Sequence, residues 1–317
     1  MPRKRKRRTT RMDIINEGQL PETLENLRLR LSSPRLRAIG TIKTYLETAA
    51  RFISEADNKS PSDNDLRRYF VARRQNGISE RTLKKEFYHL KKLCQANQWH
   101  WPFEKEDTPY TDEQAQVIAL EIHVIEQLIA ARKELTDNEQ FYLALSTTYG
   151  CRREELARVS RRDISDGTIL IRTAKHGRQV RHLIPPELTD MFEGCHPKKH
   201  EPEALSEIFR RICDKAEVKR DKGWGWHSIR RTLRTVAEWA LAKDKIPLSI
   251  WADYQGWAPV TKGNVYGGAA MMGVYSHPEI MSNDPFYIDK LIYPVHPFLP
   301  LWAKDGSTKR HRKKTKA

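Results

Sequence analysis

Two short motifs place arginine, glutamate and histidine at spacings that suit a phosphate site. The first, GCRREEL, follows a turn glycine and contains Arg152 and Glu155, so Glu155 could orient Arg152 or form an ordinary surface ion pair. The second, WHSIRRT, contains His227 and Arg230, which share one face if the segment is helical. Arginine forks bind phosphate oxygens in bidentate fashion, and an imidazole can accept or donate a proton. Either motif alone is more often surface charge, but the two together favour phosphate chemistry.

Further candidates lie on either side of the second motif. Lys175 occupies the turn AKHGR between two short apolar stretches, which would hold its ammonium at the tip of a rigid arm. The phrase QGW ends at Trp257, and the tyrosines Tyr266 and Tyr275 follow it. A tyrosine hydroxyl can attack phosphorus and stay attached, which stores the bond energy as a phosphotyrosine. Such a reaction needs neither a metal ion nor ATP.

The sequence lacks the usual motifs for nucleotide or metal cofactors. It has no Walker-type loop, no HExxH pair and no CxxC pair. The nearest cluster of metal-ligand types, Cys195, His196 and His200, has no second cysteine pair to complete a zinc site. The 4 cysteines lie far apart, as is typical of reduced thiols in an intracellular protein. We therefore expect no metal and no cofactor.

The charge of the chain predicts a polyanionic partner. Its 317 residues include 57 Lys and Arg against 41 Asp and Glu, which leaves a net charge of +16. Nucleic acid is the first candidate and an anionic membrane surface the second. No apolar stretch approaches the roughly 20 residues of a membrane span, so no transmembrane segment is expected. Basic tails at residues 1–19 and 304–317 could contact phosphates, solubilise the chain or, at RKRKRR, act as a nuclear address.

Residues 20–103 have the apolar spacing of several short helices, which predicts a small helical domain. Thr41 is expected to cap one helix and Ser79 another. Ser62 and Asp65 resemble a capping box for a helix between those two. Lysines outside the apolar stripes would give the domain a basic DNA-binding face: Lys43, Lys84, Lys85, Lys91 and Lys92.

A charged, proline-containing stretch at residues 104–118 is expected to be a linker, and residues 119–303 to form a second domain. Helical spacing recurs near residues 122–131, 138–149, 203–216 and 227–242. The run TILIR, the turn AKHGRQ and the run VRHLIP predict a β-hairpin. The chain is thus expected to be mainly α with a small β-sheet in the second domain.

In their order along the chain these features resemble the tyrosine recombinase, or phage-integrase-like, family. The family pattern runs Gly-x-Arg-x-x-Glu-Leu, a hairpin Lys, His-x-x-Arg, Gly-His or Gly-Trp, and a tyrosine commonly followed by x-His. Those places fall on Gly150, Arg152, Glu155, Leu156, Lys175, His227, Arg230, Gly256 and Trp257, then on a tyrosine of VYGG or VYSH. The resemblance covers about residues 35–280, since TIKTYLETAARFI is similar to part of the family's amino-terminal DNA clamp. Each motif alone is weak, whereas five in order are specific.

The resemblance implies a role for each residue. Arg152 and Arg230 would clamp the non-bridging oxygens of the scissile phosphate, where charge builds in the transition state. Lys175 would protonate the departing 5′ oxygen, and His227 would accept the tyrosine proton or bind the phosphate. Trp257 stands where many relatives have histidine, and its indole can pack and donate one hydrogen bond but cannot titrate.

Two tyrosines compete as the nucleophile. Tyr266 lies nine positions after Trp257, the spacing usual in the family, but flanking glycines make its surroundings a poor helix. Tyr275 lies eighteen positions after Trp257, yet it ends the helix-prone run AAMMGVY and precedes Ser276 and His277, as in the family's phrase. A short helix presents a nucleophile with better-defined geometry than a glycine-flanked loop. We therefore favour Tyr275, with Tyr266 as the alternative.

The resemblance implies a two-domain DNA clamp, in which a helical core-binding domain precedes the catalytic domain. The expected activity is site-specific recombination or integration of double-stranded DNA, typical of mobile genetic elements, with self-association into a synaptic tetramer. A type IB-like topoisomerase and a catalytically inactive DNA-binding protein of the same fold are the alternatives. Arg153 and Arg178 are further DNA-contact candidates. The expected location is intracellular and DNA-associated, in the cytoplasm or nucleoid or in a eukaryotic nucleus, and not at a membrane.

Overall fold

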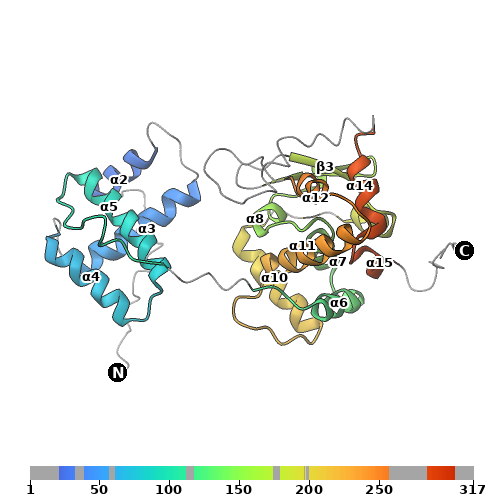
Figure 1. Cartoon of the computed structure of the whole chain (residues 1–317), viewed down its shortest axis with the longest axis horizontal. Helices are drawn as coiled ribbons and strands as arrows, with labels where there is room; N and C mark the ends of the chain where they lie inside the picture. The colour runs from blue at the N-terminus through green and yellow to red at the C-terminus, as the bar shows by residue number, and fades with distance from the viewer. Residues whose placement is uncertain are drawn as a thin grey trace, which may run out of the picture. The chain divides into compact units, whose positions relative to one another are not determined.

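The computed structural model describes residues 21–32, 39–56, 61–111, 118–173, 179–195, 197, 200–256 and 284–303. Contacts between Cα atoms divide the chain into two compact units, Met1–Gln116 and Val117–Ala317, each with its own hydrophobic core (Figure 1). Helices dominate both units, and the described strands all lie in the second. The expected fold class, mainly α with a small sheet in the second domain, is confirmed.

The first unit is a set of helices whose apolar stripes meet in one core. Leu27, Leu83 and Leu90 are completely buried at its centre. Trp101 and Phe103, which follow the last helix, pack against the same core. The helices are α2 (Glu22–Ser32), α3 (Ile39–Ala56), α4 (Asp63–Gln75) and α5 (Glu80–Asn97).

Two of the helix starts expected in this unit are confirmed. The Ser62 side chain accepts a hydrogen bond from the backbone N–H of Asp65, whose carboxylate accepts one from Ser62 N at 2.8 Å, so α4 begins with a capping box. The hydroxyl of Ser79 accepts from the backbone N–H of Thr82 and caps α5. Both signals are local, since the cap and its partner lie three residues apart.

The expected cap at Thr41 is wrong, because α3 already begins at Ile39 and Thr41 lies in its first turn. The first residues of this turn do not pack into the core, so no apolar pattern marks it in the sequence. Ile39 is 86% exposed, and a Cβ added at Gly40 would meet no neighbour within 4 Å. The apolar periodicity therefore begins later than the helix does.

A buried carboxylate joins three helices of the first unit. Glu86 of α5 is 4% exposed and accepts hydrogen bonds from Arg51 of α3 at 2.5 Å and from Arg73 of α4 at 2.6 Å. The hydroxyl of Tyr69 donates to its other oxygen at 3.0 Å. A charge taken out of water needs such partners, so this cluster fixes how α3, α4 and α5 pack together.

The second unit is built around α7, whose residues from 141 to its end are all buried. Helix α11 packs on α7 and α12, and α10 packs on α7 and α8 (Figure 1). The four helices expected from the sequence correspond to α6, α7, α10 and α11, with ends that agree within one residue. The helices are α6 (Ile122–Ala130), α7 (Asp137–Tyr149), α8 (Arg153–Leu156), α9 (Thr189–Gly194), α10 (Pro202–Lys215), α11 (Trp226–Lys243), α12 (Leu248–Tyr254), α14 (Tyr287–Ile292) and α15 (Leu299–Trp302).

A small antiparallel sheet with strand order β1-β2-β3 completes the second unit. Strands β2 (Thr168–Arg172) and β3 (Gln179–Leu183) pair in register along their whole length, which confirms the expected hairpin. Strand β1 (Ile164–Ser165) pairs with β2 and forms an additional edge strand of the sheet. The sequence did not reveal it, because two residues are too short to display an alternating pattern.

The segment at residues 284–303 packs on its own unit through buried polar groups. Asp289 of α14 lies 2.8 Å from His182 Nδ1 and accepts the backbone N–H of Leu183 at 2.8 Å, which joins α14 to β3. The Nε2 atom of His296 lies 2.9 Å from a backbone carbonyl in the last turn of α7. The carboxy-terminal helices are thus tied to both the sheet and the central helix.

Within the described ranges, no helix is long and apolar enough to cross a membrane. The same residues contain no group of three or more His, Cys, Asp or Glu side chains that could hold a metal ion. The four cysteines are unpaired and buried.

Glu139 joins the start of α7 to α10. Its carboxylate accepts the backbone N–H of Thr136 at 2.9 Å, and it binds Arg211 at 3.0 Å and Lys215 at 2.7 Å. Burial raises the pKa of Glu139, but the hydrogen bonds, led by that from Lys215, outweigh burial and lower the pKa to about 2. Folding therefore stabilises the charged form of this carboxylate.

We predict that Glu139→Gln lowers the free energy of unfolding by roughly 1.5–3 kcal/mol at pH 7, the range for hydrogen bonds to charged groups. A carboxylate with a lowered folded pKa contributes stability that is full above its unfolded pKa, near 4.5, and is lost as the pH falls through about 2. The difference between variant and native chain should therefore close between pH 5 and 2 in urea titrations.

The matched control is Glu207→Gln, which removes the exposed partner of Arg210 and should change the urea midpoint little at any of these pH values. An equal loss of stability in both variants would contradict the role given to Glu139.

Candidate active site

The site begins at the C-terminal end of α7, where Gly150 turns the chain. Its φ is +60°, and a Cβ at this position would lie 3.1 Å from the side chain of Gln255. That side chain donates to the carbonyl oxygen of Tyr149 at 2.8 Å and so holds the turn. Glycine satisfies both the left-handed conformation and the close approach. The chain then leads directly to Arg152, the N-cap of α8.

Glu155 of α8 fixes the position of Arg152. Its Oε1 accepts from Nη1 of Arg152 at 2.5 Å, and its Oε2 accepts from the Arg152 backbone N–H at 2.7 Å. The Glu155 side chain is 2% exposed and that of Arg152 is 21% exposed. This buried, two-point contact differs from a surface ion pair, and it restrains both the backbone and the guanidinium of Arg152.

Arg230 of α11 joins the same cluster from a distant part of the chain. Its Nη1 donates to the carbonyl oxygen of Gly150 at 2.5 Å and lies 3.8 Å from Oε2 of Glu155. Its Nη2 is buried and has no hydrogen-bond partner among the described residues. Burial, and next the charge of Arg152, lower the pKa of Arg230 to about 10. The guanidinium stays charged at neutral pH, but its charge is costly and one of its donors is unused.

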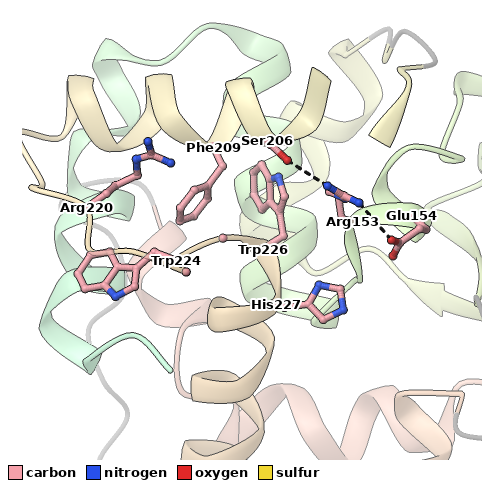
Figure 2. Close-up of a pocket in the computed structure, with 10 residues that line it drawn as sticks. Arg153, Glu154, Ser206, Phe209, Arg220, Trp224, Trp226 and His227 are labelled. Atoms are coloured by element: carbon pink, nitrogen blue, oxygen red, sulfur yellow. Dashed lines mark hydrogen bonds and ion pairs between the residues drawn. The ribbon is translucent and has the colours of Figure 1, made fainter. Parts of the chain in front are cut away.

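His227 lies one helical turn before Arg230 on α11, so the two side chains share a face of that helix. It is partly exposed and lines a pocket of about 250 Å³ together with Arg153 (Figure 2). Arg153 donates to Ser206 Oγ at 3.3 Å, and its Nη2 lies 3.6 Å from the carboxylate of Glu154. The structure thus brings Arg152, Glu155 and Arg230 together and sets His227 and Arg153 at a neighbouring pocket.

The other residues expected at the site lie outside the described ranges. They are Lys175, Arg178, Trp257, Tyr266 and Tyr275. The described frame around them consists of β2 and β3, which flank the hairpin turn, and of α12, which ends shortly before the QGW phrase. Their roles stay predictions.

The lysines expected to contact DNA lie on α3 and α5. Lys43 and Lys85 are exposed, whereas Lys84, Lys91 and Lys92 are partly exposed. The Nζ atom of Lys84 donates to Thr111 Oγ1 at 3.4 Å. Contact between this face and DNA stays a prediction.

Sequence reasoning missed two residues beside the site, Trp224 and Arg220. Both line the pocket of Figure 2 with His227, and Trp224 is half-buried. The sequence offered one weak signal: Trp224 lies between Gly223 and Gly225, three residues before His227. Arg220 lies among other charged residues and carried no such signal.

No protein-family model matches this chain, and no curated protein matches it either. Solved structures do match it. A lambda integrase tetramer bound to a Holliday junction superposes with a TM-score of 0.57 at 12% identity, over 78% of each chain. A lambda integrase dimer bound to a COC′ core site superposes with a TM-score of 0.56 at 12% identity, over 76% of this chain and 98% of that one. XerH recombinase bound to its difH substrate superposes with a TM-score of 0.50 at 16% identity, over 89% of this chain and 91% of that one.

These likenesses establish the fold. The chain has the integrase fold of lambda integrase and XerH, with its small antiparallel sheet set among helices. The structural matches span both of the units described above, since they cover three quarters or more of the chain.

We predict that Arg230→Gln lowers the melting temperature less than Glu155→Gln does, because the removal of a costly buried charge partly offsets the lost hydrogen bond to the Gly150 carbonyl. Glu155→Gln should lower it by about 4 °C or more, since a loss near 2 kcal/mol from a hydrogen bond to charge corresponds to such a shift in a unit of this size. Scanning calorimetry measures both. The control is Arg153→Gln, whose side chain is 35% exposed and whose loss should be small. A larger loss for Arg230→Gln than for Glu155→Gln would contradict this description of the cluster.

Proposed function

We propose that this chain is a site-specific DNA recombinase or integrase of the tyrosine recombinase family. It cleaves and rejoins DNA through a covalent 3′-phosphotyrosine, without a metal ion and without ATP. One observation carries the proposal: two arginines, Arg152 and Arg230, lie beside the same buried carboxylate, that of Glu155, on a fold of the integrase type.

The arginine pair suits the transition state of phosphoryl transfer. Charge builds on the non-bridging oxygens as the fifth bond to phosphorus forms, and donors that are already in position stabilise it without reorganisation. Arg152 is partly exposed but held by Glu155, and Arg230 keeps one unused donor in a poorly hydrated setting. A phosphate oxygen supplies the missing acceptor and offsets the cost of the buried charge.

The remaining steps need a nucleophile and two proton transfers. Tyr275, or alternatively Tyr266, attacks phosphorus, and the 5′ oxygen departs with a proton from Lys175. His227 accepts the proton of the tyrosine or binds the phosphate, and its place one turn before Arg230 on α11 supports this role. The indole of Trp257 can pack and donate one hydrogen bond but cannot titrate, so Trp257 does not take over proton transfer.

Double-stranded DNA is the proposed substrate, and a tetramer on DNA is the proposed assembly. The net charge of +16 and the lysines of α3 and α5 support binding to a polyanion. Similar folds occur in an integrase tetramer on a Holliday junction and in XerH on difH, which supports the same arrangement here. We infer that the chain works inside the cell on a mobile element's DNA, and that the separation of its helical and catalytic parts by a linker at 104–118 lets it clamp the duplex.

We predict that the chain forms a denaturant-resistant adduct with nicked duplex DNA from its own replicon, in the presence of EDTA and without nucleotide. The nick allows a short product to diffuse away, so the phosphotyrosine accumulates. Arg152→Ala and Arg230→Ala should each slow adduct formation by roughly 10² or more, as for the loss of one transition-state donor, while duplex affinity stays within a few-fold. Gel analysis after boiling in detergent measures the adduct.

The matched control for these variants is Arg210→Ala, an exposed arginine of α10 whose removal should leave adduct formation unchanged. Cleavage that stops on chelation and returns with magnesium would point to a nuclease. Relaxation of supercoiled plasmid without any strand exchange would point to a topoisomerase.

We predict that Tyr275→Phe abolishes the adduct and that Tyr266→Phe does not, because phenylalanine lacks the attacking oxygen but keeps the ring. Peptide mapping of the trapped adduct should identify Tyr275 directly. Loss of the adduct in Tyr266→Phe, with survival in Tyr275→Phe, would assign the nucleophile to Tyr266.

A further inference from the structure

The pocket of Figure 2 is not explained by phosphate cleavage itself. It has a volume of about 250 Å³ and opens beside His227 between α8, α10 and the start of α11. In the view of Figure 2, Arg220 and Trp224 stand on its left side, and Arg153 and Glu154 on its right. The volume is slightly below the range of sites for drug-sized ligands, so the pocket suits an occupant as small as one nucleobase.

The wall formed by Trp224 favours a flat aromatic occupant. Trp224 is half-buried, packs against the core of its unit and keeps part of its indole accessible. It lies between Gly223 and Gly225, and a Cβ at Gly223 would approach Ile118 to 2.5 Å, so the chain passes unusually close to its neighbour there. Base stacking on an aromatic side chain tolerates any base, because every base has a π-face.

The charged rim decides between a base and a bare phosphate. Arg153 and Arg220 attract the backbone of a polyanion. Glu154, however, places a carboxylate at the same pocket, which repels a phosphate but accepts a hydrogen bond from the exocyclic amino group of adenine, cytosine or guanine. Thymine has no such amino group. The combination therefore fits a base whose own phosphates lie outside the pocket, near the arginines.

The pocket borders the arginine cluster described above. Arg153 directly follows Arg152, and His227 lies one helical turn before Arg230. A nucleotide whose base enters this pocket therefore lies close to the phosphate that Arg152 and Arg230 hold.

We propose that this pocket receives one unpaired base of the bound DNA, next to the phosphate held by Arg152 and Arg230, and that it prefers amino-bearing bases to thymine. The inference rests on the proposed function, because it takes DNA as the substrate of the neighbouring site. A base must leave its stack to enter, so the pocket favours DNA in which one base is already unpaired.

The test uses the full chain and short fluorescein-labelled duplexes of one sequence, either fully paired or with a single extrahelical dA, dC, dG or dT. We expect the duplexes with extrahelical dA, dC or dG to bind roughly fivefold or more tightly than the paired duplex, with dT the weakest of the four. Fluorescence anisotropy at one fixed salt concentration measures the affinities.

Four variants assign the effect to the pocket. Trp224→Ala should remove the preference for extrahelical bases, whereas Trp224→Phe should keep most of it because an aromatic face remains. Glu154→Gln should narrow the difference between dC and dT, since an amide can both donate and accept. The control is Trp239→Ala, a tryptophan that is 77% exposed and lies about 18 Å further along α11 from His227 at 1.5 Å per residue. This variant should behave as the native chain does.

Equal affinity for paired and extrahelical-base duplexes would overturn the proposal, as would a preference that survives in Trp224→Ala. In either case tight binding of the paired duplex and adduct formation would leave the proposed function standing. Failure to bind any duplex would instead overturn the proposed function, and this inference with it. Binding of the paired duplex reports folding independently, so a misfolded Trp224→Ala is recognised by its loss of that binding. Trp224→Phe then decides: a preference kept in this folded variant supports stacking on an aromatic face, and one lost from it contradicts the assignment.

Discussion

The packing of the second unit depends on hydrogen bonds to the last backbone carbonyl oxygens of α7. A helix leaves its final carbonyl oxygens without intrahelical partners, and here they are buried. The hydroxyl of Tyr254 donates to the first of them at 3.1 Å, and His296 lies 2.9 Å from the same oxygen. Gln255 donates to the next and Arg230 to the carbonyl of Gly150. Three separate segments thus donate to the carbonyl oxygens at one helix end. The need to pair these oxygens places Arg230 beside the chain that leads to α8.

Glu155 adds the electrostatic part of this arrangement. Two guanidinium groups that approach one another in a poorly hydrated interior repel, and the charge of Arg152 contributes to the lowered pKa of Arg230. The carboxylate of Glu155, which contacts both groups, reduces that repulsion. Because α8 has only one turn, it cannot hold this carboxylate alone, and its packing against α10 together with the burial of Leu156 supplies the rigidity.

Much of the fold and part of the candidate site could be predicted from the sequence, because the patterns that indicate them involve residues close together in the chain. Capping boxes such as that of Ser62 involve neighbours three residues apart, and the long helices have clear apolar stripes. The pairing of Glu155 with Arg152 follows from the same spacing, whereas its approach to Arg230 crosses 75 residues and depends on how α11 packs. The pocket at Trp224 could not be foreseen either, since its lining comes from α8, α10 and the segment before α11. Contacts made by tertiary packing leave no periodic trace in one sequence.

Two buried carboxylates, Glu86 and Glu155, each lie beside two arginines, and their contacts show why the second is the better candidate for a substrate site. In the first unit Glu86 binds Arg51 at 2.5 Å and Arg73 at 2.6 Å, so both guanidinium groups are engaged closely. In the second unit Glu155 binds Arg152 at 2.5 Å but lies 3.8 Å from Arg230. In each cluster one buried guanidinium nitrogen, Nε of Arg51 or Nη2 of Arg230, has no hydrogen-bond partner among the described residues. The difference therefore lies in the carboxylate contacts. Close ion pairs with both arginines stabilise helix packing in the first unit, whereas the looser pairing of Arg230 leaves a buried charge whose cost the proposed phosphate would offset.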